Sequence, residues 1–158
     1  MRKLHAWGLV TLLATGTALA AEEPFDACNV FTQADAEKAL GTTAAPEPVN
    51  PKVKRPKVVT SCTYTGFKEG KPVEAKVQFR ASRTEADAQH AFDEAKLKFS
   101  TKPLLIPGAD ATFWSSKTGE MNVRKGRTWF VLAIGSARPS EREIEASKAL
   151  AEALARRL

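Results

Sequence analysis

The sequence has few of the residues on which many enzymes and metal sites depend. It contains two histidines and two cysteines in 158 residues, too few for a Cys/His zinc site if the cysteines pair with each other. No G-x-S-x-G turn presents a serine nucleophile, and no D-x-D-x-D-G loop provides a calcium site. We therefore predict no catalytic residues, no metal, no cofactor, and a protein that is not an enzyme.

Glycine and proline are not abundant either. There are nine of each, which excludes a collagen-like or low-complexity chain. With 43% hydrophobic and 27% charged residues, the chain has the composition of one ordinary globular domain.

The one long uncharged run lies at the N-terminus. Residues 6–20 carry no charge, follow the basic start Met1-Arg2-Lys3, and end in the small residues of Ala18-Leu19-Ala20. Threonine and glycine interrupt the run, which is shorter than the roughly 20 apolar residues that a membrane span needs. No cysteine follows it directly for lipid attachment. We predict a signal peptide over 1–20, a single domain over 21–158, a periplasmic location and no transmembrane segment in the mature chain.

Removal of residues 1–20 changes the charge and the histidine count. It removes Arg2 and Lys3 but no acidic residue. The mature chain then has 22 basic and 18 acidic residues, and the formal charge falls from +6 to +4. The removal also takes His5, which leaves His90 alone. We interpret His90 as a surface residue of a helix; a general base is the alternative, but it would need a nucleophile within reach.

Two cysteines remain in the exported chain. An even number of cysteines in an oxidising compartment is typical of a disulfide, so we predict that Cys28 and Cys62 join the segment before the first helix to the first strand. The chain-entropy model gives about 3.5–4 kcal/mol for closing such a loop. A redox pair or a metal site is the alternative, but the C-x-x-C spacing of such sites is missing.

Hydrophobic periodicity predicts three helices and five strands. Capping boxes open the helices, the turn-rich stretch 66–72 makes a hairpin, and the last strand is apolar on both faces, which indicates a central position. The expected elements are a helix over 32–40, strands over 58–66 and 73–80, a helix over 82–99, strands over 111–116, 120–125 and 128–135, and a helix from 140. This order predicts an α+β fold, with a five-stranded, mostly antiparallel sheet, helices packed on it and one disulfide.

Several short motifs follow one another in a familiar layout. Cys28-Asn29-Val30-Phe31-Thr32 precedes Ala39-Leu40-Gly41, Cys62 precedes Tyr64, and Pro107-Gly108-Ala109-Asp110-Ala111 precedes Phe113-Trp114. This layout resembles a group of uncharacterised exported domains, many of them lipoproteins, and covers most of the mature chain. The fold is also similar to the PsbP-like architecture, an antiparallel sheet flanked by helices. The resemblance implies the fold and the disulfide, and it implies no known activity.

Basic residues concentrate in loops and turns. Their ordinary role is to keep such segments solvated; the alternative is one cationic surface for an anionic envelope polymer, a lipid headgroup or an acidic protein. The low net charge and the lack of a binding motif argue against nucleic acid. The candidate basic surface consists of Lys52, Lys54, Arg55, Lys57, Lys68, Lys71, Arg124, Lys125 and Arg127.

Two tryptophans form a second candidate site. Trp114 and Trp129 lie on expected strands that could be neighbours, and Phe113 and Phe130 point the other way along those strands. If helices cover both faces of the sheet, all four rings pack in the core. If helices cover one face only, Trp114 and Trp129 form an exposed aromatic platform for a partner.

These features favour a soluble, non-catalytic binding or protein-interaction module of the periplasm. Its partner would be an unknown periplasmic protein or an anionic envelope component. One alternative is an inhibitor or immunity-type protein that blocks an envelope-targeting enzyme. Another is a small envelope hydrolase that uses two carboxylates brought together by folding, or His90 beside a hydroxyl.

The signal peptide gives the first testable prediction. We expect the secreted protein to begin at Ala21, because signal peptidase cleaves after a small-x-small tripeptide. Intact-mass measurement of the exported protein checks this. A mass that includes residues 1–20 would contradict it.

Overall fold

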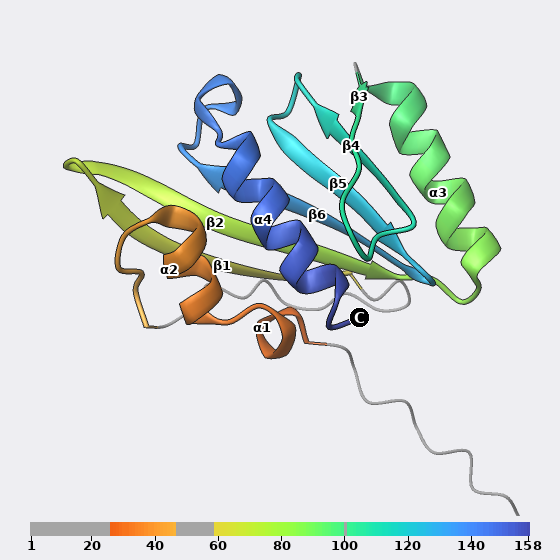
Figure 1. The fold of residues 1–158 in the computed structure, drawn as a ribbon, viewed down its shortest axis with the longest axis horizontal. Coiled ribbons are helices and arrows are strands. Elements are labelled where there is room, and N and C mark those ends of the chain that lie inside the picture. The colour runs from red at the N-terminus through yellow and green to blue at the C-terminus, as the bar shows by residue number, and fades with distance from the viewer. Residues whose placement is uncertain (1–25, 47–58, 100) are drawn as a thin grey trace, which may run out of the picture.

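The structure is a computed structural model that describes residues 26–46, 59–99 and 101–158. The predicted signal peptide lies outside these ranges. Helices and a single sheet make up the described part (Figure 1). The helices are α1 (Ala27–Val30), α2 (Gln33–Leu40), α3 (Glu85–Lys98), the 3-10 helix η1 (Pro139–Glu141) and α4 (Ile144–Ala155). The strands are β1 (Val59–Lys68), β2 (Lys71–Ala81), β3 (Thr101–Pro103), β4 (Ala111–Ser115), β5 (Glu120–Lys125) and β6 (Thr128–Gly135).

The strands form one antiparallel sheet in the order β1-β2-β6-β5-β4-β3. This confirms the α+β class, the antiparallel sheet and the inner position of 128–135. The predicted number of five strands is wrong, because the sheet has six strands within the described residues alone. The additional strand β3 is only three residues long and ends in Pro103. Proline cannot donate a ladder hydrogen bond and is confined to sheet edges, where β3 lies.

The main hydrophobic core lies on one face of the sheet. Val77, Leu132 and Met121 are partners across β2, β6 and β5, and they point to this face. Helices α1, α2 and α4 contribute Phe31, Leu40 and several leucines and alanines to the same cluster. Figure 1 shows α4 running across the sheet, with α1 and α2 near β1 and β2.

Helix α3 packs on the opposite face. Its Phe92 contacts Phe113 of β4 at a ring distance of 5.1 Å and Trp129 of β6 at 6.3 Å. These residues form a second, smaller cluster. Helices therefore lie on both faces of the sheet.

Two helices begin later than their capping boxes predict. The N-cap of α3 is Thr84, whose hydroxyl accepts the Asp87 N–H at 3.1 Å, instead of Ser82. Helix α4 begins at Ile144 instead of Ser140, because Glu143 N–H donates to the Ile134 carbonyl at 2.9 Å and holds this segment against β6. The box at the start of α2 is formed as predicted.

The β1–β2 hairpin is longer than predicted. Its strands continue to Lys68 and Lys71 and are joined by the two-residue turn Glu69-Gly70. Both turn residues have positive φ, 52° and 75°, which matches the twist of the flanking strands and favours glycine at the second position.

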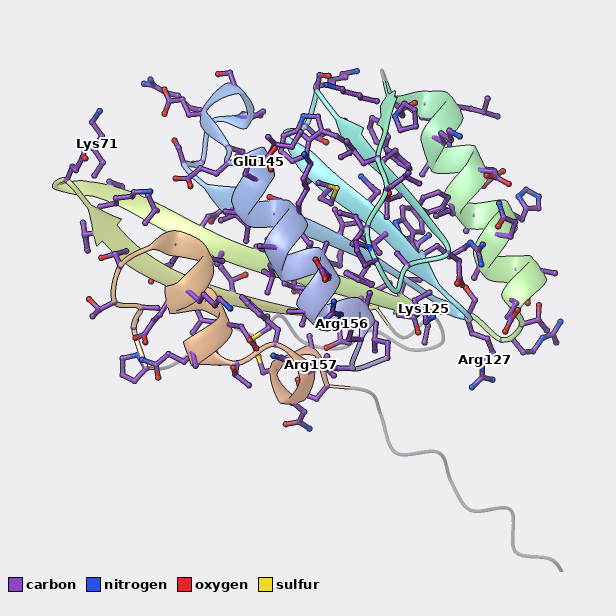
Figure 2. All side chains as sticks on the ribbon, viewed as in Figure 1. Lys71, Lys125, Arg127, Glu145, Arg156 and Arg157 are labelled. Atoms are coloured by element: carbon purple, nitrogen blue, oxygen red, sulfur yellow. A yellow bond between two sulfur atoms is a disulfide. The ribbon has the colours of Figure 1, made fainter. Side chains whose placement is uncertain are left out.

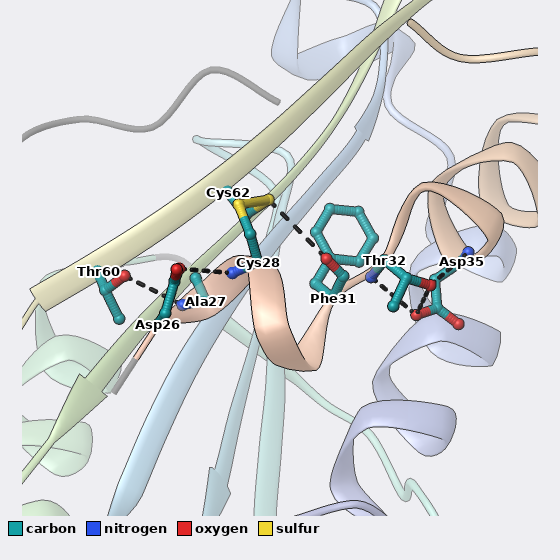
Figure 3. Close-up of a disulfide and its surroundings, with 8 residues drawn as sticks. All are labelled: Asp26, Ala27, Cys28, Phe31, Thr32, Asp35, Thr60 and Cys62. Atoms are coloured by element: carbon teal, nitrogen blue, oxygen red, sulfur yellow. Dashed lines mark hydrogen bonds between the residues drawn. A yellow bond between two sulfur atoms is a disulfide. The ribbon is translucent and has the colours of Figure 1, made fainter. Parts of the chain in front are cut away.

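A disulfide joins α1 to β1, as predicted (Figure 3). The Cα atoms of Cys28 and Cys62 are 5.2 Å apart. The Ala27 N–H donates to the Thr60 hydroxyl at 3.1 Å, and Asp26 caps α1 by accepting the Cys28 N–H at 2.9 Å. The bridge therefore attaches a four-residue helix, too short to be stable alone, to the first strand.

Removal of the disulfide should lower the stability and keep the fold. We expect Cys28→Ala/Cys62→Ala to lose about 3–4 kcal/mol of unfolding free energy, because the unfolded chain regains loop entropy. Urea unfolding measures this loss, and circular dichroism checks that the secondary structure remains. A loss below about 1 kcal/mol would mean that the bridge contributes little beyond the packing of Phe31.

Candidate functional site

The predicted basic surface is divided between distant parts of the molecule. Lys68 and Lys71 flank the β1–β2 turn, whereas Arg124, Lys125 and Arg127 lie at or beside the β5–β6 turn. Figure 2 shows Lys71 at one end of the molecule and Lys125 and Arg127 at the other. Strand β2 runs between these ends, over about 33 Å at 3.3 Å per residue. The structure does not bring these two groups together. Lys52, Lys54, Arg55 and Lys57 lie outside the described residues.

Several of the described cations already have acidic partners. Lys68 Nζ lies 2.9 Å from Glu143 Oε1. Asp110 accepts the Gly126 N–H at 2.7 Å and pairs with Arg124 at 3.4 Å and Lys125 at 3.8 Å. These carboxylates reduce the positive charge at both ends of the sheet.

Trp114 and Trp129 do not form one platform. Trp114 is paired with Met121, and Met121 with Leu132, so Trp114 lies on the face of the main core. Trp129 is an odd number of residues from Leu132 along β6 and points to the α3 face. The structure therefore corrects the prediction that these two rings share one platform. Strand β5 lies between β4 and β6, and the register places the two rings on opposite faces of the sheet.

Trp129 lies in a cluster of polar and aromatic contacts. The guanidinium carbon of Arg80 lies 5.0 Å from the centre of its ring, within cation–π range. Its indole N–H donates to Asn122 Oδ1 at 3.2 Å, and the ring is approached by Phe92 on α3. Arg80 and Trp129 are direct cross-strand partners. The indole is thereby fixed in orientation, with the cation against it.

A shallow depression of about 30 Å³ adjoins this pair. It is formed on the α3 side of β1, β2 and β6, where neighbouring side chains from three strands meet. Its lining residues are Val59, Gln78, Arg80, Trp129 and Val131. We call these five residues the Arg80 site.

The Arg80 site contains one residue that the sequence singled out, Trp129. Arg80 and Gln78 were visible as polar residues of an alternating strand, but so were Lys76 and Glu74. Only the pairing of Arg80 with Trp129 and Val59 distinguishes it from the others. The alternation of polar and apolar residues along this strand indicates that Arg80 and Gln78 share a face of the sheet. Only the cross-strand register shows which residues of the neighbouring strands lie beside them.

A larger groove of about 170 Å³ lies between α2 and α4. Its charged end is an ion pair within the chain: Arg157 donates to both carboxylate oxygens of Asp35, at 2.6 and 2.7 Å, and to the Val30 carbonyl at 2.9 Å. Asp35 also accepts hydrogen bonds from Thr32 in the capping box. The rest of the lining is Lys38, Ala39, Ala146, Ala149, Leu150 and Ala153. The Arg157 guanidinium therefore links the residues after α4 to α2.

This ion pair perturbs both of its members. The hydrogen bonds from Arg157, first of all, and from Thr32 lower the pKa of Asp35 from 3.8 to about 2, against an opposing effect of burial. The hydrogen bond to Asp35 also raises the pKa of Arg157. The perturbed carboxylate has a structural role, because its oxygens are occupied by the helix cap and the guanidinium.

His90 is exposed on α3. Within the described ranges, no three His, Cys, Asp or Glu side chains are grouped so that they could hold a metal ion. No helix in the described part of the chain is long and apolar enough to cross a bilayer. Comparisons with protein-family models, curated proteins and solved structures found no match. The resemblance to exported domains stays a prediction.

The Asp35–Arg157 pair predicts a specific pH dependence of stability. Because the pKa of Asp35 is lower in the folded than in the unfolded chain, its contribution is complete above about pH 4 and lost as the pH falls towards 2. We expect Asp35→Asn to cost roughly 1–2 kcal/mol at pH 6, after allowing for solvent screening at the partly exposed Arg157, and much less near pH 2.

Denaturant unfolding of both proteins at the two pH values measures this difference. Arg157→Gln, which removes the other partner, should also cost less near pH 2 than at pH 6, in addition to a pH-independent loss of its hydrogen bond to the Val30 carbonyl. An equal loss at both pH values would show that Asp35 acts as a neutral cap instead of an ion-pair partner.

Proposed function

We propose that the mature chain is a periplasmic, non-catalytic binding module for an anionic component of the cell envelope. The observation that carries this proposal is the position of the Arg80 guanidinium carbon over the Trp129 ring, 5.0 Å from the ring centre. Among the residues that the structure describes, no carboxylate forms an ion pair with Arg80. A cation–π contact leaves the N–H donors of the guanidinium available, and they lie in the plane of the group, where they can bind an anion.

Nearby side chains extend this binding surface along β2. Lys76 lies on the same face of the strand as Arg80, is exposed, and also has no ion-pair partner in the described ranges. Gln78 lies between them, exposed, with amide donors and an acceptor. Trp129, Val59 and Val131 add partly exposed apolar surface beside these polar groups. Cations beside an aromatic ring suit an anion with some apolar surface.

The arrangement favours binding over catalysis. The carboxylate with the strongly lowered pKa, Asp35, is held by Arg157 and the α2 cap. His90 is exposed on α3, and the Arg80 site contains neither a carboxylate nor a histidine. The disulfide is compatible with an oxidising, extracytoplasmic compartment.

Cosedimentation tests the proposal. The mature protein is mixed with purified peptidoglycan, or with phosphatidylglycerol vesicles, at low and high salt. We expect retention on at least one of these probes that falls with salt. Arg80→Gln should weaken binding about tenfold or more, because a charge-assisted hydrogen bond contributes about 1.5–3 kcal/mol. Lys76→Gln should weaken it less.

Arg138→Gln is the matched control. Arg138 is an exposed arginine of the segment before η1 that pairs with Glu141, so its loss should leave retention unchanged. Retention that ignores Arg80→Gln, or no retention on either probe, would contradict the proposal. Capture of one tight protein partner instead would support the inhibitor, and release of soluble fragments from peptidoglycan would support the hydrolase.

A further inference from the structure

The Arg80 site consists of two adjacent cross-strand rows. Val59, Arg80 and Trp129 are partners across β1, β2 and β6. Gln78 and Val131 are partners in the row beside them. Cross-strand neighbours have Cβ atoms about 4.5–5.5 Å apart, and the next row on the same face is about 7 Å away. One cation, one amide and two valines are therefore presented within the reach of a small ligand.

The charge of the site fits a single negative charge. Arg124 pairs with Trp129 from the other side, but its guanidinium is engaged by Asp110. Lys76 is four residues from Arg80, about 13 Å along the strand. A phosphate dianion or a densely charged polymer would be better served by a second cation close to Arg80. A carboxylate carries one charge and matches the planar guanidinium in a two-hydrogen-bond arrangement.

The size of the site limits what accompanies the carboxylate. A depression of about 30 Å³ holds only about two or three water-sized groups, because one water needs about 10–15 Å³ by the same measure. A methyl group fits there beside Val59 and Val131, whereas a sugar ring or a long side chain does not. The exposed Gln78 amide can hydrogen-bond a peptide group next to the carboxylate.

We infer that the Arg80 site binds the free carboxyl terminus of a short peptide that ends in a small residue such as alanine. Arg80 holds the carboxylate, the depression takes the methyl group, and Gln78 contacts the preceding peptide unit. This inference rests on the proposed function and names the chemical group of the envelope component that the site recognises. Peptide ends displayed on a polymer would also give multivalent retention from weak individual contacts.

An NMR titration of the ¹⁵N-labelled mature protein tests this inference. The probe is acetyl-alanyl-alanine with a free carboxylate, and the reporter is the Trp129 indole N–H. We expect saturable shifts of that resonance and of the Gln78 side-chain amide. The C-terminal amide of the same dipeptide should bind at least tenfold more weakly, because it lacks the charge that Arg80 pairs with.

Three variants separate the contacts. Arg80→Lys keeps the charge but loses the planar fork, so binding should weaken several-fold or more. Val131→Leu should fill the depression and weaken alanine-terminated probes more than acetate, which has no side-chain methyl group to place there. Arg138→Gln should bind as the unmodified protein does. Unchanged ¹⁵N spectra away from the site verify that each variant is folded.

The outcomes distinguish this inference from the proposed function. Equal binding of acetyl-alanyl-alanine and its C-terminal amide overturns the inference. Tighter binding of oligogalacturonate, a polymer of sugar carboxylates, than of the dipeptide also overturns it. If the dipeptide does not bind while Arg80-dependent retention on an anionic probe persists, the inference fails and the proposed function stands. If Arg80→Gln changes neither measurement, both fail.

Discussion

The antiparallel register between β2 and β6 decides which side chains meet at the proposed site. It places Arg80 directly beside Trp129 and Gln78 beside Val131, and the β1–β2 hairpin adds Val59 on the other side. Because successive side chains of a strand alternate between faces, a slip of one residue would move Arg80 into the main core and replace it by an apolar neighbour. Such a slip is prevented by the core itself: Val77, Phe79 and Leu132 are fully buried on the other face.

The two layers of helices have different relations to this site. The Cys28–Cys62 bridge attaches the layer of α1, α2 and α4 to β1, and the Asp35–Arg157 ion pair links α2 to the residues after α4 within this layer. This layer stabilises the face opposite to the site. On the site's own face, α3 contacts Trp129 through Phe92, with the two rings nearly perpendicular, and the Nε1 hydrogen bond to Asn122 fixes the ring's orientation. The indole is thus held by packing and by this hydrogen bond. Arg80 lies over the ring, and no carboxylate in the described part of the chain forms an ion pair with it.

Much of the fold was predictable because the local signals agree with it. The capping box at Thr32, the alternation over 73–80 and the two-faced apolar strand 128–135 each form the expected element. The late start of α4 was not predictable, since it depends on the Glu143 N–H bond to Ile134 on a distant strand. Strand β3 was not predictable either, because its three residues are too few to show a hydrophobic periodicity. Local pattern thus gives an element's type, whereas its bounds depend on tertiary contacts.

The candidate site was less predictable for a related reason. Whether Trp114 and Trp129 share a face depends on the number of residues in two turns: four between β4 and β5, and two between β5 and β6. One residue more or less in either turn would reverse the result. The basic residues were identifiable by type, but their separation along β2 and their pairing with Asp110 and Glu143 required the structure. Arg80 became a candidate only through its position beside Trp129.

The central claim is that Arg80 is a ligand-binding cation and not merely a packing partner of Trp129. A crystal structure of the mature protein grown with acetyl-alanyl-alanine tests it most directly. The account predicts the terminal carboxylate in the plane of the Arg80 guanidinium, with two N–H···O contacts of about 2.7–2.9 Å and the terminal methyl group between Val59 and Val131. A carboxylate bound elsewhere, with Arg80 unchanged against the indole, would contradict it.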